Sequence, residues 1–279
     1  GLLDLFLPSF EHTSRLYRQD AHHRFHDVSA EAGIIPSDNA VQGVFFDADL
    51  DGDLDLFVSR GSGFANRMFL NQGNGVFVDE ANARRLADPT PHGQGLAIAD
   101  YDNDGDFDIY MSNSNGANRL YRNDANSAGM LGYFREVASA AGVRDESRSL
   151  GCMFADFDND GWVDLYVGNF GPNRLYRNLG NGKFADLSAA SHSDNGDRGY
   201  GTGVTDYNND GLLDIFFSNS GQPSVLLQNE NPPQHWLKIL LVGKKSNRNG
   251  IGALVRIDDG IRQQTQQLLV GYSMVSGGG

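Results

Sequence analysis

Short apolar runs bounded by aspartate, asparagine and glycine recur along the chain. Four of them directly follow an acidic segment: Leu56–Val58, Ile109–Met111, Leu165–Val167 and Ile215–Phe217. In most units a second run and a turn rich in glycine and asparagine come next, and an aromatic residue then opens a third run. These aromatic residues are Phe25, Phe77, Phe134 and Phe184. Runs of this length and composition are typical of β-strands joined by tight turns.

The pattern repeats with a period of roughly fifty residues. The aspartates that begin the apolar runs are spaced by 51, 53, 56 and 50 residues; they are Asp4, Asp55, Asp108, Asp164 and Asp214. A unit of that length with about four short strands matches one blade of a β-propeller. A helical solenoid would instead show apolar positions spaced by three and four over a dozen residues. We therefore predict an all-β protein that forms a partial β-propeller.

The first unit is incomplete in this chain. Gly1–Leu7 corresponds to Gly211–Phe217, but no acidic segment precedes the first copy. We expect a fragment of a longer repeat protein, with about four whole blades, one partial blade and the missing blades in the parent chain. The blades are assigned to residues 1–231, truncated at the N-terminus.

The repeat stops after residue 231. Residues 232–279 are predicted to form a small β-module, truncated at the C-terminus, in which Gly250 and Gly252 permit a tight turn. Strands are predicted at His235–Gly243, Leu254–Ile257 and Gln267–Val270.

Each whole unit carries the acidic pattern Asp-x-Asp/Asn-x-Asp-Gly-x-x-Asp. Calcium takes about six to eight oxygen ligands, and alternating acidic side chains can wrap round one such ion. The predicted side-chain ligands are Asp47, Asp49, Asp51 and Asp55; Asp100, Asp102, Asp104 and Asp108; Asp156, Asp158, Asp160 and Asp164; Asp206, Asn208, Asp210 and Asp214. After the glycine, one position need offer only its backbone carbonyl; it is assigned to Asp53, Asp106, Val163 and Leu213. One calcium ion per whole blade, about four in all, is expected.

Other cation loops do not fit this pattern. An EF-hand needs a glutamate at its twelfth position and flanking helices, whereas the twelfth residues here are Val58, Met111, Val167 and Phe217. Magnesium prefers water and few protein carboxylates, which favours calcium. Since one hairpin fills the positions of each loop, little room is left for a substrate. We therefore expect calcium to be structural in each blade and predict no catalytic residues.

The acidic composition follows from these loops. With 22 basic and 36 acidic residues the formal charge is −14, and fifteen of the acids occupy the first, third, fifth and ninth loop positions. Four divalent ions would bring the total to −6. The sequence has no basic stripe that could neutralise phosphates, which argues against a nucleic-acid partner. It also shows no membrane span, and its single cysteine, Cys152, is expected to be buried in a strand.

The repeats resemble FG-GAP and VCBS repeats, the calcium-binding blades also found in the propellers of integrin α-chains. His235-Trp-Leu237 and Asn247-Arg-Asn-Gly-Ile-Gly-Ala253 resemble the start of an ASPIC/UnbV module. That combination is similar to the cartilage acidic protein family and its bacterial relatives. The resemblance implies a seven-bladed propeller, calcium binding, and an extracellular, cell-surface or periplasmic location. It also implies a role in adhesion or matrix contact.

Three functions remain open on the sequence alone. The first is a calcium-stabilised module that binds an unknown protein or glycan. The second is an enzyme whose active site lies in the propeller channel, lined by segments such as Thr90–Gly95 or Ser191–Gly201, with calcium only as scaffold. The third is a scaffold that presents an attached domain. No catalytic motif is found, so the binding module is the prediction.

Overall fold

Antiparallel β-sheets dominate the part of the chain that the computed structural model describes. The description covers every residue except 1, 35–38, 62, 90–91, 125–131, 197, 233–234, 246, 261 and 270–279. Within it, the only α-helix is α1 (Ala138–Ala141). The predicted all-β class is confirmed.

Three sheets have four strands that follow one another in sequence order. The first of these contains β4 (Ala40–Phe46), β5 (Asp55–Arg60), β6 (Arg67–Asn71) and β7 (Phe77–Asp79). The second contains β8 (Gly93–Ala99), β9 (Asp108–Asn113), β10 (Arg119–Asn123) and β11 (Phe134–Glu136). The third contains β12 (Ser149–Ala155), β13 (Asp164–Asn169), β14 (Arg174–Asn178) and β15 (Phe184–Asp186).

The sheets at the two ends of this series have three strands each. One contains β1 (Leu5–Leu7), β2 (Arg15–Gln19) and β3 (Phe25–Asp27). The other contains β16 (Gly199–Thr205), β17 (Asp214–Asn219) and β18 (Val225–Leu227). Asp4 confirms the register of the first, because its Oδ1 accepts the Gln19 N–H at 3.1 Å as Asp55 Oδ1 accepts the Asn71 N–H at 2.8 Å. β1 is thus the counterpart of the second strand in the other sheets.

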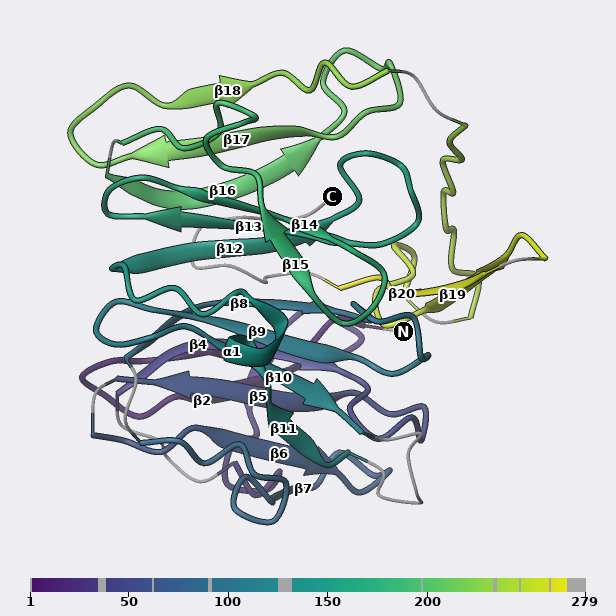
Figure 1. The fold of residues 1–279 in the computed structure, drawn as a ribbon. Coiled ribbons are helices and arrows are strands. Elements are labelled where there is room, and N and C mark those ends of the chain that lie inside the picture. The colour runs from purple at the N-terminus through teal and green to yellow at the C-terminus, as the bar shows by residue number, and fades with distance from the viewer. Residues whose placement is uncertain are drawn as a thin grey trace.

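Successive sheets stack face to face (Figure 1). Each of the four core clusters joins two sheets that are neighbours in sequence. The second strands of the three four-stranded sheets are buried on both faces: in β13, Leu165 and Val167 pack toward the preceding sheet, whereas Tyr166 packs toward the following one. Side chains of a strand alternate between its faces, so a continuous apolar run is what a sheet between two others needs.

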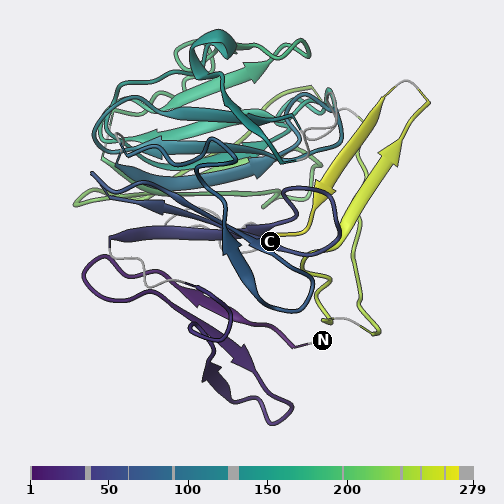
Figure 2. The same cartoon turned by 90° about the horizontal axis from the view of Figure 1, so that it is seen from below.

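At both ends of the stack, the equivalent side chains are exposed. Leu5 and Leu7 of β1 are 42% and 46% exposed, and Phe216 of β17 and Leu226 of β18 are 45% and 46% exposed. In the inner sheets these positions are buried against a neighbouring sheet. Figure 2 shows the first sheet at one end of the stack.

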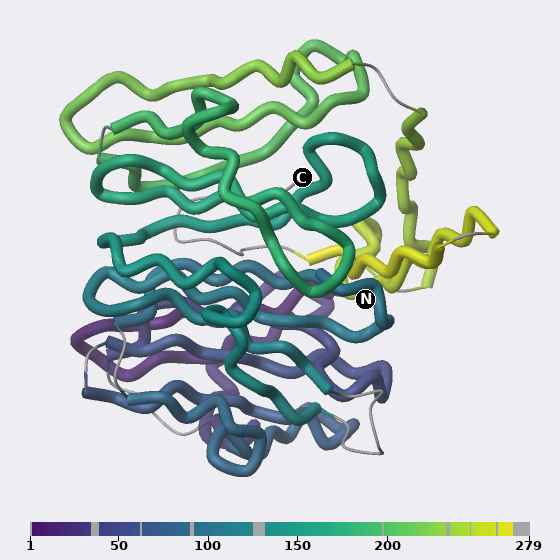
Figure 3. Tube along the Cα trace, viewed as in Figure 1, coloured from purple at the N-terminus to yellow at the C-terminus, as the bar shows by residue number. Residues whose placement is uncertain are grey.

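The C-terminal module contains a hairpin, β19 (Leu254–Asp258) paired with β20 (Gln263–Gln267). The first strand agrees with the prediction, whereas the second, β20, shares only Gln267 with the strand predicted at Gln267–Val270. The prediction of a strand at His235–Gly243 is wrong. This segment runs beside the stack in an extended trace (Figure 3) and pairs with no described strand, with Leu237 and Leu240 70% and 86% exposed. A favourable composition does not make a strand without a partner.

The module lies against the ends of the sheets that carry the acidic loops. The Asp47 N–H donates to Gln267 Oε1 at 3.0 Å, and the Arg262 guanidinium donates to the Asp160 carbonyl. The indole of Trp236 lies against Gly211, leaving no room there for a Cβ atom. The module therefore contacts three of the four acidic loops.

Candidate metal centres

Each acidic loop connects the first and second strands of a sheet, and all four lie at the same end of the sheets. The glycine at the sixth position has a positive φ in each, for example +94° at Gly52 and +86° at Gly161. Only glycine adopts this conformation without strain, so the repeated glycine is a requirement of the turn.

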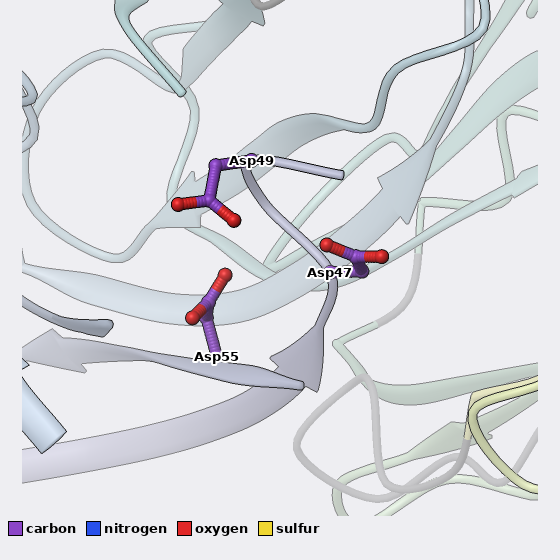
Figure 4. Close-up of side chains that lie close together, drawn as sticks. All are labelled: Asp47, Asp49 and Asp55. Carbon is purple, nitrogen blue, oxygen red and sulfur yellow. The ribbon is translucent and has the colours of Figure 1, made fainter. Parts of the chain in front are cut away.

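In three loops the structure brings three carboxylates together. In each set of three, one oxygen from each carboxylate lies within 4.8 Å of the corresponding oxygens of the other two. The groups are Asp47, Asp49 and Asp55; Asp100, Asp102 and Asp108; Asp156, Asp158 and Asp164. Figure 4 shows the first group, with carboxylates from the loop and from the start of β5 directed toward a common point. Converging carboxylates are the donor set that calcium prefers.

The first aspartate of each loop holds the turn closed. Asp100 accepts the N–H groups of Asp104 and Gly105, both at 3.0 Å, and the other three loops repeat this pair of bonds. The loop is therefore shaped by its own backbone before any ion arrives.

The ninth aspartate ties two strands to the loop. Asp108 Oδ2 accepts the Tyr101 N–H at 3.1 Å, and its Oδ1 accepts the Asn123 N–H at 2.8 Å. Asp55, Asp164 and Asp214 make the same two bonds. This residue is thus both a candidate ligand and a structural acceptor.

A repeated asparagine, missed as a functional residue, links the sheets beside the loops. Asn123 Nδ2 donates to the Phe107 carbonyl of its own loop at 3.2 Å and to the Ala48 carbonyl of the preceding loop at 2.8 Å. Asn178 and Asn229 repeat this arrangement. Its signal in the sequence is an asparagine that recurs after the second apolar run of each whole unit, ahead of the turn.

Burial raises the pKa of the clustered carboxyls, and neighbouring aspartates add to this effect. The pKa values of Asp55 and Asp100 rise to about 7, mainly through burial, and that of Asp164 to about 8. Asp49 Oδ1 and Asp102 Oδ1 are buried without a hydrogen-bond partner. Buried carboxylates that repel one another and lack partners are unfavourable in the absence of a cation. The donor set therefore fits a hard divalent cation.

The fifth aspartate of each loop lies outside the three-carboxylate groups. In the third loop, Asp160 Oδ2 accepts from Arg177 at 3.1 Å, and the same guanidinium pairs with Asp158 Oδ2 at 2.7 Å. A cavity of about 280 Å³ adjoins these residues. An ion in this loop would compete with Arg177 for two carboxylates.

The fourth loop is more open. Asn208 replaces the aspartate of the third position, and its Nδ2 donates to Asp210 Oδ2 at 2.7 Å. Asp206 and Asp214 keep the loop bonds described above, but the loop presents one charge fewer than the third.

The carbonyl assignment needs a correction at two residues. Counted from Asp156 and Asp206, Val163 and Leu213 are eighth in their loops, and their carbonyls accept from Asn178 at 3.0 Å and Asn229 at 3.1 Å. The counterparts of Asp53 and Asp106 are Trp162 and Leu212. The seventh position, not the eighth, is thus the candidate for a carbonyl ligand.

Among the described residues, no other cluster of possible metal ligands is found beside the three aspartate clusters. Of the segments considered as channel lining, Thr90, Pro91 and Asp197 lie outside these residues. Cys152 is buried in β12, as expected.

The repeat unit decides the family. A family model described as FG-GAP-like repeat matches residues 47–111, 100–167 and 156–217, which together span more than half of the chain. The chain belongs to the FG-GAP-like repeat family. Each matched FG-GAP-like repeat begins at the first aspartate of an acidic loop and ends in the second strand of the next sheet.

Among curated proteins, the chain is similar to cartilage acidic protein 1. It is 38% identical to the Mus musculus protein over 157 residues, which is 54% of this chain and 24% of that protein. It is 35% identical to the Homo sapiens protein over 158 residues, 54% of this chain and 23% of that protein. The match thus spans about a quarter of the length of these relatives. Neither they nor FG-GAP-like repeats form an enzyme family, which agrees with the prediction.

Two solved structures are similar at low identity. An Agrocybe aegerita lectin that recognises non-reducing terminal N-acetylglucosamine has a TM-score of 0.41 and 18% identity, covering 81% of this chain and 63% of the lectin chain. The Photorhabdus luminescens Tc holotoxin pore has a TM-score of 0.36 and 16% identity, covering 95% of this chain and 14% of that chain. With both TM-scores below 0.5, neither likeness bears on function. No helix among the described residues has the length and apolar character to cross a bilayer.

Proposed function

We propose that this chain is part of an extracellular β-propeller that binds a protein or glycan partner, with a structural calcium ion in each whole blade. The main support for the calcium sites is that the same cluster of three carboxylates recurs in three sheets, with the same hydrogen bonds around it. Acidic surface turns would not share that geometry. The proposed ligands are the aspartates and Asn208 predicted above, with the seventh carbonyl of each loop.

The position of the candidate sites supports a structural role. Each carboxylate cluster lies where the loop, the start of the second strand and the end of the third strand meet, so an ion bound there would join three segments of one sheet. The repeated asparagine connects each loop to the next sheet as well. Calcium would therefore stabilise both the blades and their stacking, by about 2.7 kcal/mol per site at a concentration a hundredfold above its dissociation constant.

The remaining assignments are also proposals. Similarity to cartilage acidic protein 1 supports a location outside the cytoplasm and a role in adhesion. Residues 1–231 are proposed to be propeller blades, and residues 232–279 a separate ASPIC/UnbV-like module. The exposed apolar faces of the first and last sheets support further blades in a longer parent chain.

The test is a calcium titration by calorimetry, combined with thermal melting in chelator and in excess calcium. We expect binding of about four ions and a large rise in melting temperature. Magnesium at the same concentration serves as the control and should raise the melting temperature less. Binding without a change in melting would contradict the structural role, and absence of binding would contradict the calcium sites.

A further inference from the structure

The ends of the sheets opposite the acidic loops carry a second set of equivalent residues. His92, Arg148 and Arg198 directly precede β8, β12 and β16. Their backbone carbonyls accept hydrogen bonds from the segment that follows the second strand of each sheet, at 3.1, 2.7 and 2.9 Å. The repeat thus places these three side chains at the same level on three successive sheets.

Arg148 and Arg198 meet at one aromatic ring. Their guanidinium carbons lie 4.5 and 4.9 Å from the centroid of the half-buried Phe170 ring. Both arginines are exposed. Within the described ranges, neither is in an ion pair, although most other arginines of this acidic chain pair with aspartate or glutamate. The structure therefore places two like charges against one aromatic ring, without a countercharge from these residues.

Such a pair favours an anionic group. Each exposed cation–π contact is weak, and the two guanidinium groups repel each other. A carboxylate bound beside the ring would accept charge-assisted hydrogen bonds, for which the planar guanidinium is well suited. An anion would thus reduce the repulsion between the two charges while the ring holds the guanidinium groups in place.

The surroundings have the composition of a protein interface. Tyr200, two residues after Arg198 on β16, is 42% exposed. Phe10, 51% exposed, stacks on His92 with ring centroids 6.1 Å apart. Burial, and then Arg148, lower the pKa of His92, so its imidazole is neutral near pH 7. Arginine and aromatic residues are enriched at the centres of interfaces.

We propose that Arg148, Phe170 and Arg198 form a docking site for an acidic side chain of a partner protein. This inference rests on the proposed function as a binding module and names its partner class and its site. A side-chain carboxylate brings one negative charge to the two arginines, whereas the formal charge of −14 repels a long polyanion. The site lies at the opposite end of the sheets from the calcium loops, so the ions do not attract the ligand.

The probe is N-acetylglutamate methylamide, titrated into the calcium-loaded chain while the arginine Nε–H signals are followed by NMR. We expect saturable shifts at Arg148 and Arg198, and no shifts with the matched glutamine compound. Arg148→Gln and Arg198→Gln should each weaken binding at least tenfold. Lys183→Gln makes the same charge change in the turn between β14 and β15 and should leave binding unchanged.

Equal shifts with the glutamine compound, or binding that survives both arginine substitutions, would overturn the proposal. Binding of methyl glucuronide without binding of the glutamate probe would overturn it in favour of an acidic glycan. Asp197, which lies outside the described residues, directly precedes Arg198. If the glutamate probe bound the Asp197→Asn variant but not the unaltered chain, the proposal would also be overturned, because the unaltered chain would then have no site for the ligand. A calcium titration of the same sample keeps the two proposals distinct, because its result does not depend on these probes.

Discussion

Asn178, at the end of β14, donates its side-chain amide to the carbonyl oxygen of Tyr101, 77 residues earlier, at 2.8 Å. The same amide donates to the Val163 carbonyl at 3.0 Å, so one side chain joins the acidic loops of two sheets. Asn71 occupies the equivalent position in the first four-stranded sheet, where, among the described residues, its amide donates only to the Leu54 carbonyl of its own loop, at 3.2 Å. Comparing substitutions of Asn178 and Asn71 therefore measures how much the hydrogen bond between sheets contributes to the free energy of unfolding.

We expect Asn178→Ala to lower the free energy of unfolding by about 2–4 kcal/mol, because it leaves two carbonyls without their donor. Asn71→Ala should cost about 1 kcal/mol, because one such bond is lost. Denaturant unfolding of both variants in excess calcium gives the comparison. Equal losses would show that the contact between sheets contributes nothing.

Two aspartates of the first loop should respond differently to removal of charge. Asp49→Asn removes a carboxylate whose Oδ1 is buried without a partner, so the metal-free chain should be as stable as before or more stable. Asp55→Asn places an NH₂ group against the N–H of Ala48 or Asn71 and should cost about 2–4 kcal/mol. Both variants should bind calcium more weakly at this loop. Thermal melting in chelator and calorimetric titration measure the two effects, and a large loss of metal-free stability in Asp49→Asn would contradict this division.

The metal-free chain should become less stable as the pH rises. The pKa values of Asp55 and Asp100 are about 7 in the folded chain against 3.8 as the ordinary value. The folded state therefore binds protons more tightly than the unfolded state, and stability falls as pH rises from about 4 through about 7. Melting temperatures in chelator at pH 5, 6, 7 and 8 should decrease in that order. In saturating calcium the decrease should disappear, because the ion replaces the protons.

Asp102→Asn is the control for this pH effect. It removes a carboxyl whose pKa is raised to about 6, mainly by burial, and whose Oδ1 has no partner. The melting temperature of the metal-free variant should depend less on pH than that of the unaltered chain. An unchanged slope would assign the effect to other groups.

Arg177 should weaken cation binding in the third loop. Arg177→Gln frees Asp158 and Asp160, and we expect an affinity gain of up to about fivefold, since an exposed pair of this kind contributes at most about 1 kcal/mol. Trp162 lies within this loop, so terbium luminescence excited through its indole reports on the site. Trp236→Phe removes the signal from the fourth loop, and Arg24→Gln is the charge-matched control. Weaker terbium binding in Arg177→Gln would show that the arginine supports the site.

Contact between the C-terminal module and the loops can be tested with two glycines. Gly161→Ala strains a residue with φ +86° and also places a Cβ atom 2.7 Å from Gln264 Nε2. Gly52→Ala strains a residue with φ +94° but meets no atom within 4 Å. We expect only Gly161→Ala to increase proteolysis of the module in addition to lowering stability. Equal proteolysis of the two variants would contradict the docking.

The sequence by itself determined the repeat, its register and the loops. Local spacing is enough for this, because a nine-residue loop places its own carboxylates and the alternation of a strand assigns its faces. Such features depend on residues that are close in the chain.

Only the tertiary structure decided the features that depend on distant segments. Asp108 accepts a hydrogen bond from Asn123 as well as being a candidate ligand, and Asn178 donates to the Tyr101 carbonyl. Both contacts form only when the third strand of a sheet lies beside its own loop and the loop of the preceding sheet. The run at His235–Gly243 has the composition of a strand, but no described strand supplies its hydrogen bonds. The meeting of Arg148 and Arg198 at Phe170 likewise requires two sheets to stack, since more than twenty residues separate each arginine from that ring in the sequence.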